Sequence, residues 1–177
     1  MAKTYYAAIN WNEIEDIIDK STWEKLTEQF WLDTRIPLSN DLDDWRSLSD
    51  AEKEMVSHVL GGLTLLDTVQ SESGMAQLKD AVRTPHEEAV LNNIAFMESV
   101  HAKSYSSIFS TLNTKAEIEK IFEWVDTNSY SQKKAEIINE VYKNGSDLQK
   151  KVASVYLETF LFYSGFYTPL HYLGNNK

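Results

Sequence analysis

Apolar residues recur at helical spacing in the middle of the chain. The run Ser49-Asp50-Ala51-Glu52 fits a capping box, in which serine and glutamate side chains satisfy the free backbone N–H groups at a helix start. Apolar side chains follow at intervals of three or four residues, at Val56, Leu60, Leu63, Leu66 and Val69. The pattern predicts a helix that begins after Ser49 and stops at Gly74, with irregular chain to about Arg83.

A second helix start follows at Thr84-Pro85-His86-Glu87. Threonine suits the N-cap, proline the first helical position and glutamate the third. Beyond it, steps of three and four residues connect one continuous face, formed by Leu91, Ile94, Glu98, His101, Tyr105, Ile108 and Leu112. The spacing predicts a long helix with two polar groups and a tyrosine on its inward face.

The rest of the chain also reads as helix and loop. Shorter helices are expected over residues 21–32, 114–126 and 131–143, and a final long helix from Asp147 to about Tyr167. Thr168-Pro169 would close this last helix and leave His171 in a loop. Segment 33–48 is expected to be an extended loop, and no stretch alternates long enough to predict a strand. The fold class expected is all-α.

Composition narrows the class of protein. At 177 residues and 20.4 kDa, the chain suits a single helical domain, residues 1–177, without internal repeats. Its 27 acidic and 17 basic side chains give a net charge of −10, which argues against nucleic-acid binding because phosphate contacts need a basic surplus. The lack of cysteine excludes disulfides and thiolate ligands. No apolar secretory segment follows Met1, so we expect a cytoplasmic protein.

Three acids stand alone in apolar helical windows. Apart from His58, Asp67 is the only acid or base over residues 55–71, Glu98 over 89–100 and Glu158 over 152–170. A buried, ionised carboxylate without a partner costs more than the net stability of a domain, so it must be neutralised, paired or bound to metal. The last window is long enough to raise a membrane span, but Glu158, several hydroxyls and Pro169 favour a buried helix.

A metal centre inside a helix bundle would satisfy these groups together. Glu98 and His101 are three residues apart, so their side chains lie on one helix face about one turn apart. This Glu-x-x-His pattern is typical of ferritin-like carboxylate bundles. Oxygen ligands with one imidazole and no sulfur suit iron or manganese. Tyr105, one turn further on, could be oxidised beside such a centre.

Simpler interpretations stay open for each of these features. Glu-x-x-His is a weak motif by itself, and Glu158 could pair with an arginine across the bundle. His58 lies nine residues from Asp67, on the opposite side of the helix, and is interpreted as a surface or satisfied histidine. Without a metal, Tyr105 and Trp31 are ordinary core aromatics.

Several long motifs resemble one known family along essentially the whole chain. They are Asn10-Trp11-Asn12, Glu28-Gln29-Phe30-Trp31-Leu32-Asp33, Gly61-Gly62-Leu63-Thr64-Leu65-Leu66-Asp67, Phe96-Met97-Glu98-Ser99-Val100-His101-Ala102-Lys103-Ser104-Tyr105-Ser106 and Leu157-Glu158-Thr159-Phe160-Leu161-Phe162-Tyr163-Ser164-Gly165. The chain resembles the small, radical-generating subunit of class Ib ribonucleotide reductase.

The resemblance implies a ferritin-like fold, a homodimer and a dinuclear manganese or iron centre that oxidises a neighbouring tyrosine. A separate large catalytic subunit would use the radical to reduce ribonucleoside diphosphates, and a flavodoxin-like activator would supply oxidant to the manganese form. No nucleic-acid or membrane partner is expected.

The resemblance also implies roles for individual residues. Asp67, Glu98 and His101 would bind the first metal ion, with Glu98 bridging, and Glu158 would be a terminal ligand of the second. By the same resemblance, Tyr105 would carry the radical and Trp31 would be the near end of the electron path toward the large subunit.

One departure from the family pattern is visible. The family needs a second Glu-x-x-His on a later helix, and no such motif precedes Asn175-Asn176-Lys177. We therefore expect the N-terminal portion of a ferritin-like bundle, incomplete at its C-terminus. A different di-metal oxidase and a non-catalytic helical fragment stay open as alternatives.

Overall fold

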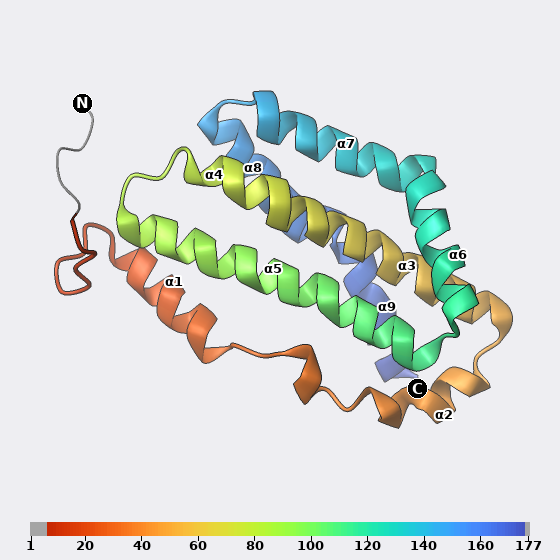
Figure 1. Cartoon of the computed structure of the whole chain (residues 1–177). Helices are drawn as coiled ribbons and strands as arrows, with labels where there is room; N and C mark the ends of the chain where they lie inside the picture. Colours follow the sequence, from red (N-terminus) through yellow and green to blue (C-terminus); the bar gives the residue numbers. More distant parts are fainter. Residues whose placement is uncertain (1–6, 176–177) are drawn as a thin grey trace.

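The structure, a computed structural model, describes residues 7–175, and within that range it contains helices and no strand (Figure 1). The all-α expectation is confirmed. The α-helices are α1 (Ile17–Glu28), α2 (Leu42–Ser47), α3 (Asp50–Val69), α4 (Met75–Lys79), α5 (Pro85–Leu112), α6 (Lys115–Thr127), α7 (Ser129–Asn144), α8 (Asp147–Tyr156) and α9 (Tyr163–Gly174).

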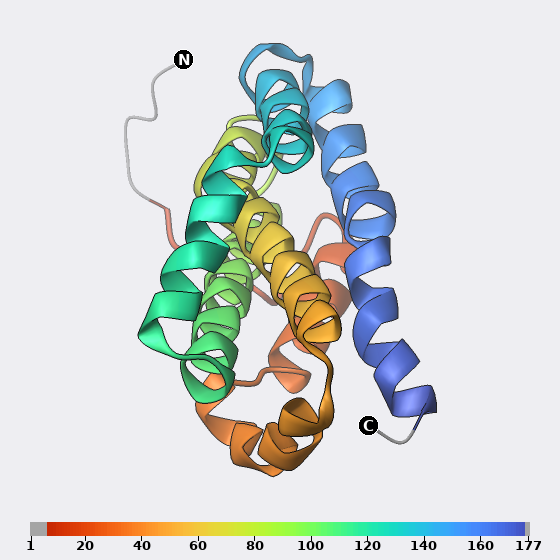
Figure 2. The same ribbon diagram turned by 90° about the vertical axis from the view of Figure 1, so that its right-hand side faces the viewer.

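Helices α3 and α5 form the centre of the bundle and run in opposite directions (Figure 1). Helix α1 packs on α5, whereas α6 and α7 pack on α3. Helices α8 and α9 follow one another along the side of the bundle, where α8 contacts α4 and α7 and α9 contacts α3 (Figure 2). The main core lies among α3, α7, α8 and α9, and is built from Leu63, Leu66, Ala135, Ile138, Tyr142, Ala153, Leu157 and Phe162.

Local capping explains where the two central helices begin. The Ser49 backbone N–H donates to Glu52 Oε2 at 2.8 Å, and the Glu52 N–H donates back to the Ser49 hydroxyl. At the start of α5, the Glu87 N–H donates to Thr84 Oγ1 at 3.0 Å. Both predicted starts are confirmed, because each depends on residues within one turn of the helix end.

The predicted stop at Gly74 is wrong. The chain continues from α3 through a π-helical turn, Gln70–Gly74, directly into α4. Glycine is required there by packing, since a Cβ atom on Gly74 would lie 2.8 Å from the Tyr142 ring. The glycine therefore marks a close approach of α7 to this turn.

The predicted end at Thr168-Pro169 is also wrong. A π-helical turn, Leu157–Leu161, interrupts the last helix, and α9 then runs to Gly174 with Pro169 inside it. Proline removes one backbone hydrogen bond from a helix, but α9 packs along α3 and continues past it. His171 consequently lies on a helix and not in a loop.

The N-terminal part differs from the expectation in where the first helix begins and ends and in the helical content of residues 33–48. Helix α1 starts four residues earlier than predicted, because Asp16 caps it by accepting from the Ile18 N–H at 2.9 Å. The expected loop 33–48 contains two 3₁₀ turns, Asp33–Arg35 and Leu38–Asp41, followed by α2. Residues 30–32, expected to end the first helix, are non-helical chain that crosses toward α5.

Large apolar side chains are exposed along one face of α8 and α9. They are Leu148, Val152, Val155, Tyr156, Phe160, Tyr163, Phe166, Tyr167, Leu170 and Leu173. Folded monomers seldom expose so many apolar groups together, and such faces commonly mark an interface. Within residues 7–175, no helix has the length and apolar character needed to cross a membrane.

Candidate metal centre

The inward face of the bundle brings together three of the four predicted metal ligands. Asp67 lies on the last turn of α3, whereas Glu98 and His101 lie one turn apart on α5. Asp67 and Glu98 are buried, with 3% and 5% of their surface exposed, and His101 is half-buried. One potential ligand atom from each of the three lies within 4.8 Å of the other two. The periodicity of each helix correctly indicated that these side chains point inward.

No lysine or arginine neutralises the carboxylates of this cluster in the part of the chain that the structure describes. Asp67 Oδ2 is buried and, among the described residues, has no hydrogen-bond partner. Burial, and then the charge of Glu98, raise the pKa of Asp67 to about 8. No ion pair with lysine or arginine reaches Asp67, Glu98 or Glu158 in the described part of the chain. The arginine pairing considered for Glu158 is therefore not found.

His101 completes the cluster on its more open side. Its Nδ1 atom lies 3.1 Å from Glu98 Oε2, and this contact raises the pKa of His101 above its ordinary value. A histidine that shares its proton with a carboxylate can exchange that proton for a metal ion when one is bound. Two carboxylates, one of them with an orphaned buried oxygen, and one imidazole fit a divalent cation that prefers oxygen and nitrogen ligands.

Glu158 faces the same interior but is held by other groups. It lies in the π-helical turn Leu157–Leu161, and its Oε1 accepts a hydrogen bond of 2.8 Å from Gln70 Nε2. Burial, and then the charge of Glu98, raise the pKa of Glu158 to about 7. The Glu158 carboxylate therefore interacts electrostatically with Glu98. It is not one of the three groups whose ligand atoms lie within 4.8 Å of one another.

Gln70, Tyr142 and Ser154 form a hydrogen-bond network that the sequence analysis missed. The fully buried Gln70 side chain donates to Ser154 Oγ at 2.9 Å as well as to Glu158, and accepts from the Tyr142 hydroxyl. Two π-helical turns, which often occur at functional sites, carry Gln70 and Glu158. Gln70 follows Asp67 by three residues, and this spacing indicates that the two side chains lie on the same helix face.

The two predicted redox side chains both lie against the cluster. Tyr105 is on α5 beside Asp67, and packs against the core formed by α3, α7 and α8. Burial, together with the negative charge of Asp67, raises the pKa of Tyr105. The Trp31 ring stacks on the His101 ring, with centroids 5.7 Å apart and planes inclined by 22°.

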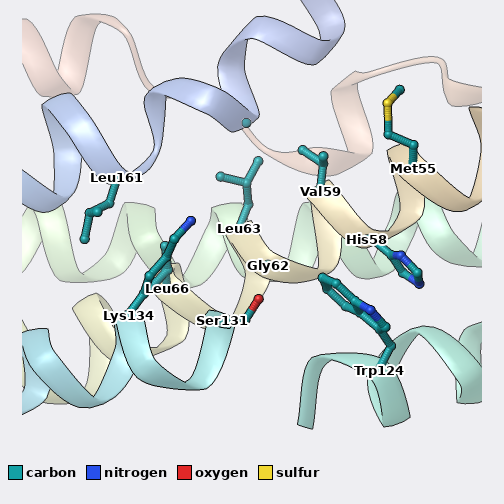
Figure 3. A pocket seen from close by; sticks show the side chains of 11 residues that line it. Met55, His58, Val59, Gly62, Leu63, Leu66, Trp124, Ser131, Lys134 and Leu161 are labelled. Carbon is teal, nitrogen blue, oxygen red and sulfur yellow. The ribbon is translucent and has the colours of Figure 1, made fainter. Parts of the chain in front are cut away.

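The other histidines of the described chain lie elsewhere. His58 stacks on Trp124 with centroids 3.9 Å apart, at the edge of a cavity of about 350 Å³ that also borders Ser131 and Lys134 (Figure 3). Burial lowers the pKa of His58, which favours its neutral form beside Trp124. His86 is buried at the start of α5, with Nε2 3.0 Å from the Asn10 carbonyl oxygen. The cavity beside His58 is lined by none of the residues of the Asp67–Glu98–His101 cluster, so it is separate from the candidate metal centre.

Comparison with known proteins agrees with this arrangement. Residues 8–177 match the family described as ribonucleotide reductase, small chain. Ribonucleoside-diphosphate reductase subunit beta nrdF1 of Mycobacterium tuberculosis is 53% identical over 170 residues, which cover 96% of this chain and 53% of that protein. Ribonucleoside-diphosphate reductase 2 subunit beta of Escherichia coli is 48% identical, over 97% of this chain and 54% of that protein.

Solved structures have the same fold. The crystal structure of dimanganese(II)-NrdF from Streptococcus sanguinis is 78% identical and superimposes with a TM-score of 0.96, over 98% of this chain and 61% of that chain. A putative class I ribonucleotide reductase from Bacillus halodurans is 27% identical with a TM-score of 0.84, over 92% of this chain and 60% of that chain.

These matches confirm the ferritin-like bundle and the resemblance noted in the sequence motifs. The chain spans about half the length of the curated relatives it matches. By family match and by identity to NrdF proteins, the chain belongs to the ribonucleotide reductase small chain family, class Ib type.

Proposed function

We propose that this chain provides the radical-generating part of a ribonucleoside-diphosphate reductase small subunit. The observation that carries the proposal is the inward group Asp67, Glu98 and His101, in which a buried Asp67 oxygen has no hydrogen-bond partner among the described residues. Tyr105 lies beside this group. The 78% identical NrdF from Streptococcus sanguinis is described as a dimanganese(II) protein, which supports a dinuclear manganese or iron centre here.

In this proposal, Asp67, Glu98 and His101 would hold one metal ion, and Glu158 together with Glu98 would hold the second. When bound and oxidised by oxygen or by the activator's oxidant, such a metal pair would supply the one-electron oxidant for a neighbouring side chain. The Tyr105 phenol is protonated at neutral pH, and its raised pKa disfavours loss of the proton alone, so the phenol would lose a proton together with the electron. The core that packs on Tyr105 keeps water away from the resulting radical.

The remaining ligands and the covering of the bundle would come from the part of the relatives that this chain does not span. The sequence contains one inward Glu-x-x-His, at Glu98 and His101, whereas a complete di-metal bundle uses two. The exposed apolar face of α8 and α9 lies in position to pack against further helices. We therefore assign residues 1–177 to the N-terminal portion of the bundle.

The family relationship supports two partners for the whole protein, a second copy of the subunit and a large catalytic subunit that receives the radical equivalent. A flavodoxin-like activator for the manganese form stays a prediction from the resemblance alone. Trp31 would be the near end of the electron path, because it stacks on His101. A cytoplasmic location belongs to the same proposal.

Metal loading followed by electron paramagnetic resonance tests the proposed function. The protein is reconstituted with Mn(II) and its activator, or with Fe(II) and oxygen, and compared with the Tyr105→Phe and Tyr130→Phe variants. Tyr130 is 80% exposed on α7 and serves as the matched control. We expect unchanged metal content in all three proteins and loss of the tyrosyl signal in Tyr105→Phe alone.

Two results would contradict the proposal. A radical signal that survives unchanged in Tyr105→Phe would assign the chain to a different di-metal oxidase. Negligible uptake of either metal by the full-length subunit, which would supply the remaining ligands, would leave a helical module without a redox role.

A further inference from the structure

The segment between α1 and the first 3₁₀ turn is attached to α5 at several points. The Phe30 ring stacks on Phe96, with centroids 6.1 Å apart, and Trp31 stacks on His101. Two residues further along, the Asp33 carboxylate accepts a hydrogen bond from the Lys103 ammonium group. These contacts place the indole of Trp31 between two attachments to the same helix.

Asp33 is the strongest of these attachments. Its side chain is buried, and its Oδ2 also accepts from the Ser107 hydroxyl at 2.7 Å. Charge-assisted hydrogen bonds are roughly twice as strong as neutral ones, and hydrogen bonding to Lys103 and Ser107 lowers the pKa of Asp33. The carboxylate is therefore ionised at neutral pH, and its Oδ2 atom is bound by both Lys103 and Ser107.

The partners of this segment share one stripe of α5. Phe96, Lys103 and Ser107 are separated by seven and four residues, so they lie above one another on the helix surface. That stripe is on the opposite side of α5 from Glu98, since a separation of five residues between Glu98 and Lys103 turns the helix by about 140°. Trp31 must therefore reach around the helix to contact His101.

Backbone geometry couples Asp33 to Trp31. Leu32, between them, has φ −129° and ψ 148°, which is extended backbone. Side chains two residues apart in extended chain project to the same side. Fixing the Asp33 carboxylate on α5 consequently aims the Trp31 indole at the same helix.

We propose that Asp33 is a positioning residue, which Lys103 and Ser107 fix on α5 so that the Trp31 indole stays stacked on His101. The positioning itself is a property of the folded chain and does not require metal. Its consequence for electron transfer rests on the proposed function, in which Trp31 connects the centre to the large subunit. In enzymes, a misplacement of about 1 Å can lower a rate by about 10²-fold.

Fluorine NMR of protein labelled with 5-fluorotryptophan measures the position of Trp31 directly. The Trp31→Phe variant assigns the resonance, which is then compared in Asp33→Asn and Lys103→Ala. Matched controls are Asp43→Asn, whose partner is the exposed Arg46, and Lys115→Ala, whose lysine is 92% exposed in an ion pair with Glu119. Lys103→Arg keeps the positive charge and tests for rescue.

We expect the Trp31 resonance to shift in Asp33→Asn and Lys103→Ala and to gain the solvent isotope shift of an exposed indole. In both controls, and in Lys103→Arg, the Trp31 resonance should have the chemical shift that it has in the unaltered protein. An unmoved Trp31 resonance in both variants would overturn the positioning role. So would a common shift of all tryptophan resonances, because Asp33 would then support the fold in general.

A second measurement separates this inference from the proposed function. In the metal-loaded protein with its large subunit, Asp33→Asn should form the Tyr105 radical at the normal yield but reduce substrate at least about tenfold more slowly. Normal turnover in a variant whose Trp31 resonance has shifted would remove the indole stack from the electron path. Absence of any Tyr105 radical in the unaltered protein would count against the proposed function and leave the NMR result unaffected.

Discussion

Two carboxylate sites flank α5, and they are neutralised in opposite ways. On the outer side, Asp33 is paired with Lys103 and Ser107, and the pKa of Asp33 is lowered. On the inner side, Asp67 has a buried oxygen that finds no hydrogen-bond partner within residues 7–175, and its pKa is raised to about 8. The first site is complete without any further group, whereas the second acquires its missing positive charge only from protons or a cation. A buried acid thus indicates a metal site only when its neighbours fail to neutralise it.

The largest effect should come from removing the inner carboxylate. Asp67→Asn keeps the shape of the side chain but removes the charge that a cation would need, so manganese affinity should fall at least about 100-fold. Asp33→Asn, the same substitution in the paired site, should leave metal affinity within about twofold, because Lys103 already balances that charge. Isothermal titration calorimetry with Mn(II) compares the two. Equal losses in both variants would contradict the distinction.

The pH dependence of the metal-free protein should also distinguish the two sites. The folded pKa values of Asp67 and Glu158, about 8 and about 7, exceed the ordinary values of 3.8 and 4.5, and that of His101 is also raised. The folded protein then holds more protons than the unfolded chain, so stability falls as pH rises from about 4 to about 8. Asp33 acts oppositely, because its lowered pKa contributes stability above pH 3.8 that is lost on acidification.

Urea unfolding with a chelator at pH 5, 6, 7 and 8 measures this dependence. Each proton released on unfolding changes the free energy by about 1.4 kcal/mol per pH unit. In Asp67→Asn, the decrease between pH 5 and pH 8 should become smaller. A free energy of unfolding that rises with pH in the unaltered protein would show that the inner acids are already compensated.

A smaller effect is expected at the amide that supports Glu158. Gln70→Leu removes the donor to Glu158 and Ser154 and the acceptor for Tyr142 inside the core. Buried polar groups left unpaired cost about 1–3 kcal/mol, so the free energy of unfolding should fall by about that amount. Gln29→Leu at the exposed end of α1 is the control and should change stability by less than about 0.5 kcal/mol. Equal losses of unfolding free energy in Gln70→Leu and Gln29→Leu would show that the hydrogen bonds of Gln70 do not stabilise the fold.

The smallest effect should come from an acid in solvent. Asp43 pairs with Arg46 at 3.0 Å, and both side chains are mostly exposed. Exposed ion pairs contribute about 0–1 kcal/mol, so Asp43→Asn should shift the free energy of unfolding by less than about 0.5 kcal/mol. Thermal or urea unfolding provides the value. A change as large as that in Gln70→Leu would contradict the ranking of the acids by burial.

Sequence reasoning predicted the features that depend on neighbours along one helix. The starts of α3 and α5 follow from caps within one turn, and the inward direction of Asp67, Glu98 and Tyr105 follows from helical periodicity. The start of α1 differs from the predicted range 21–32 because the side chain of Asp16 caps the helix further upstream. Pro169 and Gly74 were interpreted as helix ends because their local propensities disfavour helix, whereas packing on α3 and α7 overrides those propensities.

By itself, the sequence determined the helical class, the caps and the isolation of three acids, because each of these features depends only on residues within a few consecutive helical turns. Tertiary structure decided how those acids are compensated. Gln70 meets Glu158 across 88 residues, and Lys103 meets Asp33 across 70. The stack of Trp31 on His101 is equally distant in sequence. Charge compensation depends on which side chains face one another in space, and helical periodicity specifies only the face from which each one leaves its own helix.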